Sequence, residues 1–510
     1  MSGSLGGRVG WGAMNTARYL LGTGQDTASV FVDAEKSYTY RELRDAVTTL
    51  GAQLHDMHLP AGAPVALAGP NSFFWVSAYL AIMSAGLVCV PMPATLTPEE
   101  FRSRLQWVGC RAVMFSGAEG RRHDLPADVV VLVESALLEW PGAQFEICDV
   151  ELDQDAAYLF TSGTTAAPRV VRITHRNIQA NTESILDYVG LKSDDRMLVV
   201  LPFSYVFGAS LLHTHLRAGA CLVNQPSFVY LESVVGRLAE QRCTAIAGVP
   251  SNFHALIRNS SFGSRPLPDL RLIQQAGGRM SPAIIDEIRA AHPRANLFVM
   301  YGQTEATARL SYLPPAELDG HAGSIGRGVP GVSLRVVDGS GRDAMPGQIG
   351  EIWATGENIS PGYLFDERRT AEKMPGGVLR TGDLATVDAD GYIYVVDRAE
   401  DFIKSWGHRI ASQDVETAVM ELTEVISVAA VGVPDPVAGE AVAVAVVKRP
   451  DSDLDAARLL AHCRARLPKH MVPELIEFVA QLPLNSSGKV VKREVRDRLH
   501  QIASGRSVPA

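Results

Sequence analysis

The chain has 510 residues, of which 46% are hydrophobic and 20% are charged. This composition excludes a mainly disordered chain, and the length exceeds one compact core, so about two or three domains are expected. The formal net charge of −9 excludes a general attraction to nucleic acid or to an anionic membrane surface, and leaves room only for a local basic pocket.

Targeting and redox signals are weak. Residues 1–13 are rich in glycine and lack an apolar core, so no signal peptide is expected. The most apolar stretch, residues 426–447, contains Pro434 and Pro436, which predicts a strand, a turn and a strand instead of a membrane span. Six scattered cysteines without a C-x-x-C pair indicate reduced thiols. We therefore expect a cytoplasmic protein without a membrane segment, and a possible homodimer.

Helix and strand patterns alternate over the first 300 residues or so. Thr39 and Glu42 form a capping-box pair at the start of an amphipathic helix, and a second helix is expected at residues 74–85. Continuous apolar runs indicate buried strands, so this part of the chain predicts sheets covered by helices. The expected strands are residues 65–67, 87–91, 198–202, 220–223, 245–249 and 297–300.

The pattern changes near Gly323 and again near Arg398. Short alternating segments between the two points predict a small β-rich subdomain, with strands at residues 333–337, 351–354 and 392–396. The remainder predicts helix 414–422, strands 425–431 and 441–448, helix 454–467 and strand 475–480. The expected fold is α/β, with a large multi-layered N-terminal body (residues 1–398; two α/β subdomains plus the β-rich subdomain) and a small mobile α+β C-terminal domain (residues 399–510).

The first candidate site follows an apolar strand at residues 158–160. Hydroxyl groups and backbone N–H groups in a turn form an anion-binding concavity, and the guanidinium of Arg169 can hold phosphate oxygens. A polar loop that caps a helix has the same composition, so this segment alone leaves both interpretations open. The hydroxyl and glycine residues of the turn are Thr161, Ser162, Gly163, Thr164 and Thr165.

Two further segments combine a turn with a carboxylate. The sequence YGQTE at residues 301–305 follows an expected strand, where open α/β sheets place ligands; its Tyr can stack on a base and its Glu can bind Mg²⁺. The sequence TGD at residues 381–383 offers a carboxylate to the hydroxyls of a ribose. Each has a plain alternative, namely a packed Tyr with a solvated Glu, and an Asx-turn.

The charged run DRAEDFIKSWGHRI at residues 397–410 and a glycine loop that presents Lys489 complete the set. Taken alone, they are typical of a solvated surface and an exposed lysine. In this order and spacing, the five segments resemble the adenylate-forming superfamily, which includes acyl-CoA synthetases, peptide-synthetase adenylation domains and firefly-type luciferases. The resemblance extends from the helix after Thr39 to Lys489.

Such enzymes condense a carboxylate with ATP to an acyl-adenylate and pyrophosphate, and then pass the acyl group to a thiol, usually that of coenzyme A. The resemblance implies that residues 161–165 and Arg169 surround the β- and γ-phosphates. The other implied residues are Tyr301 and Gly278 for adenine, Thr304 for the α-phosphate, Glu305 for Mg²⁺, Asp383 and Arg398 for the ribose, Gly302 and Arg409 for the nucleotide, and Lys489 as a bridge between the substrate carboxylate and the α-phosphate. Of these, Lys489, Thr304, Glu305 and Arg398 are the expected catalytic residues.

The resemblance also implies two conformations of the small domain. A hinge at Glu400 would let this domain rotate after adenylation and withdraw Lys489. The same rotation would bring Trp406 and Gly407 to the wall of a tunnel for the pantetheine arm of coenzyme A. Closure of a hinged domain over a site is a common way to exclude water from a reactive intermediate.

The phosphate loop departs from the family pattern T-S-G-[ST]-[ST]-G-x-P-K-G at Ala166, Arg169 and Val170. Ala and β-branched Val oppose the positive φ that glycine tolerates, and Arg differs from Lys in reach and geometry. We hypothesise that the ATP-dependent adenylation half-reaction is weakened or lost, while thioesterification of an acyl-adenylate persists. The presence of Lys489 argues against this, and a loop remodelled only locally is the alternative.

The sequence PFSYVFG at residues 202–208 bears on the substrate. It lacks the acidic residue that pairs with the α-ammonium in amino-acid-activating relatives, and an unpaired buried ammonium is costly. It resembles the aromatic gate of acyl- and aryl-CoA ligases, which implies an acyl pocket at Tyr205, Phe207 and Gly277. We expect a hydrophobic aryl, alkyl or polycyclic carboxylic acid. The alternatives are a ligase that loads a carrier protein and a non-catalytic adenylate-binding protein.

Overall fold

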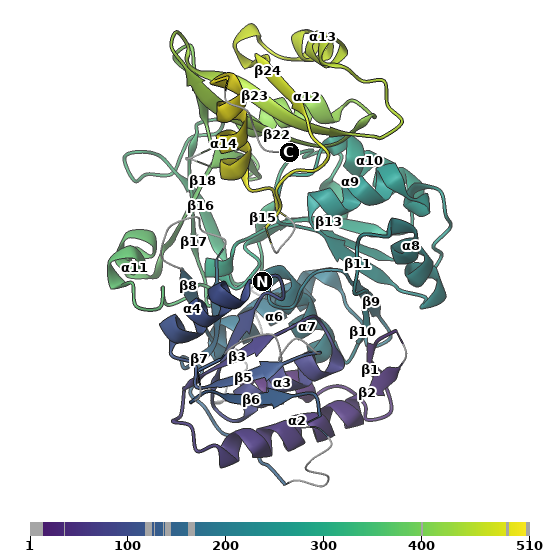
Figure 1. The fold of residues 1–510 in the computed structure, drawn as a ribbon, viewed down its shortest axis with the longest axis vertical. Coiled ribbons are helices and arrows are strands. Elements are labelled where there is room, and N and C mark those ends of the chain that lie inside the picture. Colours follow the sequence, from purple (N-terminus) through teal and green to yellow (C-terminus); the bar gives the residue numbers. More distant parts are fainter. Residues whose placement is uncertain are drawn as a thin grey trace, which may run out of the picture. The chain divides into compact units, whose positions relative to one another are not determined.

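The computed structural model describes residues 14–34, 36–117, 125–126, 128–135, 137, 144–161, 169–398, 401–485 and 489–505. The chain divides into two compact units (Figure 1). The first comprises Met1–Asp194, Ser210–Cys221 and Ser360–Glu367, and the second Asp195–Ala209, Leu222–Ile359 and Arg368–Ala510. Their mixed sheets confirm the predicted fold class, while the domain boundary at residues 398–399 stays a prediction.

The first unit contains a sheet in the order β6-β5-β3-β4-β7-β8, parallel except for the last pair. Every residue of helix α3 (Phe73–Ser84) is buried, and this helix packs between the sheet and helix α2 (Tyr40–Asp56). The strands are β3 (Pro64–Ala68), β4 (Val88–Met92), β5 (Ala112–Phe115), β6 (Val130–Val133), β7 (Asp155–Phe160) and β8 (Val170–Thr174). Also present are α1 (Thr16–Leu21), β1 (Ser29–Val32), β2 (Ser37–Thr39), α4 (Pro98–Val108) and α6 (His175–Val189).

Helix α2 begins at the predicted capping box. The backbone N–H of Thr39 donates to Glu42 Oε2 at 2.7 Å, and that of Glu42 donates to Thr39 Oγ1 at 3.3 Å. Two donors that have no partner within the helix are satisfied in this way. The prediction of this helix is confirmed, as are the helix at residues 74–85 and the first two expected strands.

The second unit contains a run of strands in the order β10-β9-β11-β12-β13-β14-β15. Strands β9, β11, β12 and β13 are parallel, and β14 and β15 continue antiparallel. Their bounds are β9 (Arg196–Val199), β10 (Cys221–Asn224), β11 (Ala245–Gly248), β12 (Leu272–Gln275), β13 (Asn296–Tyr301), β14 (Ser311–Leu313) and β15 (Arg327–Gly328). Helices α8 (Leu231–Glu240), α9 (Pro250–Asn259) and α10 (Pro282–Ala291) alternate with them.

The predicted β-rich part is an antiparallel sheet in the order β16-β17-β18-β19. A C-terminal sheet in the order β21-β20-β23-β22 follows, with β24 beside β23, and hydrophobic clusters cover it on both sides. The strands are β16 (Ser333–Val337), β17 (Gly350–Thr355), β18 (Leu379–Val387), β19 (Ile393–Arg398), β20 (Ile403–Ser405), β21 (His408–Ile410), β22 (Val425–Asp435), β23 (Gly439–Lys448) and β24 (Leu475–Phe478). The helices are α12 (Ser412–Met420), α13 (Ala456–Arg466) and α14 (Lys492–Ala503). Along the described ranges, no helix has the length and apolar character that a membrane crossing requires.

Several buried histidines are held in the neutral form. Burial lowers the pKa of His213 to about 3, and burial lowers those of His175 and His254 to about 4. His213 Nε2 forms a 2.8 Å hydrogen bond with the hydroxyl of Tyr79. The ordinary pKa of histidine is about 6.5, so below that pH the unfolded chain binds more protons than the folded chain.

We therefore expect the free energy of unfolding to fall as the pH decreases from about 6.5 to about 5, by up to about 1.4 kcal/mol per pH unit for each histidine. Denaturant titrations at a series of pH values measure this slope. The variant His213→Gln keeps a polar group for Tyr79 but cannot be protonated in this range, and should reduce the slope by up to one proton. A slope that is zero in the wild type, or unchanged in the variant, would contradict the assignment.

Candidate functional site

The buried carboxylate of Asp383 contacts two other predicted site residues, Tyr301 and Arg398. Strands β18 and β19 pair so that Asp383 lies opposite Arg398, and Arg398 Nε is 3.3 Å from Asp383 Oδ1. The hydroxyl of Tyr301, the last residue of β13, donates to Asp383 Oδ2 at 2.5 Å. Only 6% of Asp383 is exposed, so both carboxylate oxygens are held in fixed directions. Burial raises the pKa of Tyr301, and the charge of Asp383 raises it further, so the hydroxyl remains a donor.

Lys373 lies at the same turn, although the sequence did not single it out. It ends helix α11 (Glu367–Lys373), and its Nζ is 3.1 Å from the position that a Cβ on Gly382 would occupy. Burial lowers the pKa of Lys373, while the carboxylates of Glu305, Asp383 and Glu351 oppose that shift. A single lysine in a charged helix carries no recognisable pattern, so only the fold could reveal this position.

The turn after β13 leaves no room for a side chain at Gly302. A Cβ at this position would lie 1.7 Å from the carbonyl oxygen of Ala308. The chain returns closely on itself here because a short 3₁₀ turn, η3 (Thr304–Ala306), begins two residues after the glycine. The two predicted phosphate and Mg²⁺ residues, Thr304 and Glu305, therefore stand on a tightly folded turn beside Tyr301.

Backbone strain marks the end of this turn. Thr307 and Ala308 have φ values of +52° and +105°, which residues other than glycine rarely adopt. Asn358, 1% exposed, donates from Nδ2 to the carbonyl oxygens of Ala306 at 3.1 Å and Arg309 at 2.9 Å. The hydroxyl of Thr307 donates to the carbonyl oxygen of Asn358 at 2.8 Å. These bonds stabilise a conformation that the local sequence would not adopt by itself.

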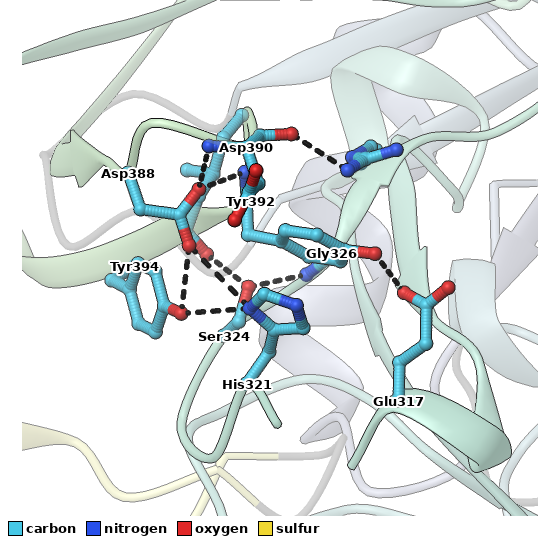
Figure 2. Close-up of polar contacts among 10 residues, drawn as sticks. Glu317, His321, Ser324, Gly326, Asp388, Asp390, Tyr392 and Tyr394 are labelled. Atoms are coloured by element: carbon cyan, nitrogen blue, oxygen red, sulfur yellow. Dashed lines mark hydrogen bonds and ion pairs between the residues drawn. The ribbon is translucent and has the colours of Figure 1, made fainter. Parts of the chain in front are cut away.

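Figure 2 shows the polar network that fixes the turn between β18 and β19. Asp388 accepts hydrogen bonds from the backbone N–H of Tyr392 at 2.8 Å and from the hydroxyl of Tyr394 at 3.1 Å. The ring of His321 stacks on Tyr392 with the centroids 3.4 Å apart, and its Nδ1 lies 3.4 Å from Asp388 Oδ2. These strands also carry the carboxylate and the guanidinium described above, and the network fixes the turn that joins them.

Lys489 meets two of the predicted acyl-pocket residues. A Cβ at Gly277, where φ is +92°, would lie 3.2 Å from Cε of Lys489 and 3.4 Å from the hydroxyl of Tyr205. The ammonium of Lys489 is 5.8 Å from the centroid of the Tyr205 ring. The carbonyl oxygen of Gly278 accepts a 2.7 Å hydrogen bond from the buried side chain of Gln275. Lys489 therefore lies close to Gly277, the first residue of the predicted glycine pair, and to Tyr205.

The third predicted acyl-pocket residue, Phe207 in helix α7 (Val206–Ala218), faces a cation. The guanidinium of Arg309 lies 4.1 Å from the centroid of the Phe207 ring, and both side chains are buried, with 1% and 2% exposed. Arg309 Nε also contacts the thioether of Met300 at 3.3 Å. A positive charge therefore lies on the aromatic wall, which the sequence analysis did not anticipate.

The phosphate loop is only partly described, since Ser162, Gly163, Thr164, Thr165 and Ala166 lie outside the described residues. At its ends, the backbone N–H of Thr161 donates to the carbonyl oxygen of Arg169 at 2.9 Å. Val170 pairs with Phe160 as the first, fully buried residue of β8 and does not have a positive φ. Val170 is therefore a core strand residue, and its position does not require the positive φ that a β-branched residue opposes.

The predicted coenzyme A segment forms a hairpin between β20 and β21. Ser405 pairs with His408, and the two residues between them, Trp406 and Gly407, have φ values of +51° and +76°, as in a type I′ turn. Trp406 is 56% exposed, and the space around the Gly407 Cβ position is open. Arg409 lies over the ring of Phe402 at 4.7 Å. The predicted hinge residue Glu400 lies outside the described residues.

A magnesium ion fits this site only together with a nucleotide. Within the described ranges, no group of three or more His, Cys, Asp or Glu residues could hold a metal ion. Mg²⁺ often binds through one or two carboxylates plus substrate phosphates, and Glu305 can supply such a carboxylate. The donor set is therefore suited to a metal ion that arrives with phosphate oxygens.

Comparison with known proteins shows the family of this chain. A model of the AMP-binding enzyme family matches residues 19–364, and a model of the AMP-binding enzyme C-terminal domain matches residues 414–489. Feruloyl-CoA synthase from Amycolatopsis sp is 33% identical over 472 residues, which cover 90% of this chain and 94% of the relative. Long-chain-fatty-acid–CoA ligase from Yersinia pestis is 30% identical over 516 residues, which cover 92% of this chain and 91% of the relative.

A solved structure has the same fold. The crystal structure of the anthranilate CoA ligase AuaEII in complex with anthranoyl-AMP has a TM-score of 0.90 and 22% sequence identity, and the match covers 96% of this chain and 98% of that one. Together with the family models, these matches confirm the resemblance that the motifs indicate. The chain belongs to the AMP-binding enzyme family, within the adenylate-forming superfamily.

Proposed function

We propose that this enzyme is an acyl-CoA ligase. It joins a carboxylic acid to the α-phosphate of ATP, which releases pyrophosphate, and then transfers the acyl group from the acyl-adenylate to the thiol of coenzyme A, which releases AMP. The observation that carries the proposal is the Asp383 carboxylate between Tyr301 and Arg398, a group suited to the two hydroxyls of a ribose. The relatives are a feruloyl-CoA synthase and a fatty-acid–CoA ligase, which favours this activity.

The residues near Asp383 take the roles that the chemistry needs. Tyr301 stacks on adenine, with Gly302 and Gly278 leaving space for the ring. Thr304 binds the α-phosphate and Glu305 the accompanying Mg²⁺, which neutralises charge on the phosphates. Negative charge builds up when a carboxylate attacks an anionic phosphorus, so a fixed cation beside both groups lowers the barrier. Lys489 is suited to this role because it lies beside Gly277 and Tyr205 in the same unit.

The substrate is a carboxylic acid without an α-ammonium group. Residues 202–208 contain no carboxylate, and the buried guanidinium of Arg309 against Phe207 would repel an ammonium placed nearby. Tyr205, Phe207 and Gly277 form the acyl pocket. The names of the relatives, feruloyl-CoA synthase and long-chain-fatty-acid–CoA ligase, fit an aryl or alkyl acid and support the same class.

We also propose that adenylation is slow relative to thioesterification. The support comes from two departures from the family pattern, Ala166 and Arg169, which bear on the binding of phosphates. The third departure, Val170, is an ordinary strand residue and adds no support. A panel of acids with ATP and coenzyme A, compared with the pre-made acyl-adenylates and coenzyme A, measures both half-reactions. ATP–pyrophosphate exchange at the rate of thioesterification would contradict slow adenylation, and no product from either set would contradict the ligase itself.

Two variants with opposite expected effects should separate adenylation from thioesterification. Lys489→Met removes the proposed cation and should slow adenylation by roughly two to three orders of magnitude, with a much smaller effect on acyl-adenylate plus coenzyme A. Gly407→Leu places a side chain in the proposed tunnel for the pantetheine arm. It should slow the reaction of acyl-adenylate with coenzyme A, with a much smaller effect on adenylation. Single-turnover measurement of each half-reaction provides the comparison.

The control for Gly407→Leu is Gly341→Leu. Gly341 has a φ of +84° and, like Gly407 at +76°, an open Cβ position, so the two substitutions carry similar backbone strain. Equal losses in both half-reactions with Gly407→Leu, or the same loss with Gly341→Leu, would overturn the tunnel assignment.

Gly302→Ala tests the turn that presents the nucleotide residues. The added Cβ cannot lie 1.7 Å from the Ala308 carbonyl oxygen, so the turn must shift. Because such shifts cost about 1–3 kcal/mol, AMP binding measured by calorimetry should weaken by about fivefold or more. Gly339→Ala, at a position with open space, should bind AMP as the wild type does. Wild-type affinity in Gly302→Ala would show that the turn does not present the site.

A further inference from the structure

Lys373 has features of a ligand-binding residue that lacks its ligand. Its side chain is half-buried at the C-terminal end of α11, and among the described residues its ammonium has no hydrogen-bond or ion-pair partner. Removing an ammonium partly from water without a direct partner costs free energy. The carboxylates of Glu305, Asp383 and Glu351 offset part of this cost, and the donors of the ammonium remain available to an anion that is supplied from outside.

The position of the ammonium indicates which anion. Nζ lies over the turn at Gly382, 3.1 Å from the position of an absent Cβ, and the backbone N–H of Gly382 donates to Glu351 Oε1 at 2.8 Å. The next residue is the proposed ribose carboxylate, Asp383. The carboxylate of Glu305, the proposed Mg²⁺ ligand, is another group that interacts with the ammonium electrostatically. The lysine therefore lies beside the proposed ribose carboxylate and within electrostatic reach of the proposed Mg²⁺ ligand.

We propose that Lys373 binds the polyphosphate of ATP beside Glu305. The inference rests on the proposed function for the location of the nucleotide. The charged groups that interact with this ammonium are three carboxylates (Glu305, Glu351 and Asp383) and one guanidinium (Arg398). Because the carboxylates outnumber the guanidinium, a polyanion that enters needs additional positive charge. An ammonium that does not have to leave another partner can bind a phosphate oxygen without breaking an existing bond. Lys373 thus supplies a cation to the polyphosphate.

A purely structural role is the competing explanation. A cation near a helix C-terminus interacts favourably with the helix dipole, and Lys373 ends α11. Such a role would affect the stability of the chain and would weaken ATP and AMP equally, if at all. A polyphosphate contact instead affects ATP selectively, because AMP lacks the β- and γ-phosphates.

The test is calorimetric titration of ATP with Mg²⁺, and of AMP, into the wild type, Lys373→Met, Lys373→Arg and the surface control Lys36→Met. Lys373→Met should weaken ATP binding by about tenfold or more and AMP binding by no more than about twofold, as expected for one charge-assisted contact. Lys373→Arg should recover part of the loss, and Lys36→Met should match the wild type. Equal weakening of ATP and AMP, or no weakening of ATP, would overturn the proposal.

These titrations use neither acid nor coenzyme A, so they remain informative if the proposed ligase activity fails. A wild type that forms no thioester but shows the selective loss of ATP in Lys373→Met would contradict the ligase and support the role of Lys373. A wild type that ligates acids, together with a Lys373→Met variant that binds ATP normally, would support the ligase and contradict the role of Lys373.

Discussion

The carboxylate of Asp383 depends on contacts from two other strands. Tyr301 reaches it from the end of β13, and Arg398 reaches it from the paired strand β19. A buried carboxylate is stable only when both oxygens are satisfied, so the two contacts fix its direction as well as its charge. The same contacts tie the parallel strands of the second unit to the antiparallel β18–β19 hairpin. A ribose that replaced water on this carboxylate would be bound by groups already in position.

Much of the surrounding structure serves to hold the backbone in unfavourable conformations. Gly302 lets two chain segments approach closely, and Asn358 stabilises the strained residues Thr307 and Ala308. The Asp388 network in Figure 2 fixes the hairpin turn between β18 and β19. These interactions involve no group that would react, yet they determine where Thr304, Glu305 and Asp383 stand. Preorganised groups of this kind stabilise a transition state without reorganising during the reaction.

Patterns of short range and regular period made much of the fold predictable. The Thr39 capping box and the apolar strands appear where the sequence placed them, and so do the motifs that contain Tyr301 and Asp383. Strand β12 was not predicted, because its last two residues, Gln274 and Gln275, are polar although buried. Lys373 and Arg309 were missed since each is a single charged residue whose environment forms only on folding. The place of Val170 in a strand was not predicted, because a motif comparison does not reveal strand pairing.

The most direct test of the account is whether the Asp383 carboxylate recognises a ribose. Equilibrium titration of AMP and 2′,3′-dideoxy-AMP into the wild type and Asp383→Asn measures this contact alone. We predict that the wild type prefers AMP by about tenfold or more, because hydrogen bonds to a charged acceptor contribute about 1.5–3 kcal/mol. Asp383→Asn should lose most of that preference. A variant that discriminates between the two nucleotides as strongly as the wild type would contradict the assignment of the site.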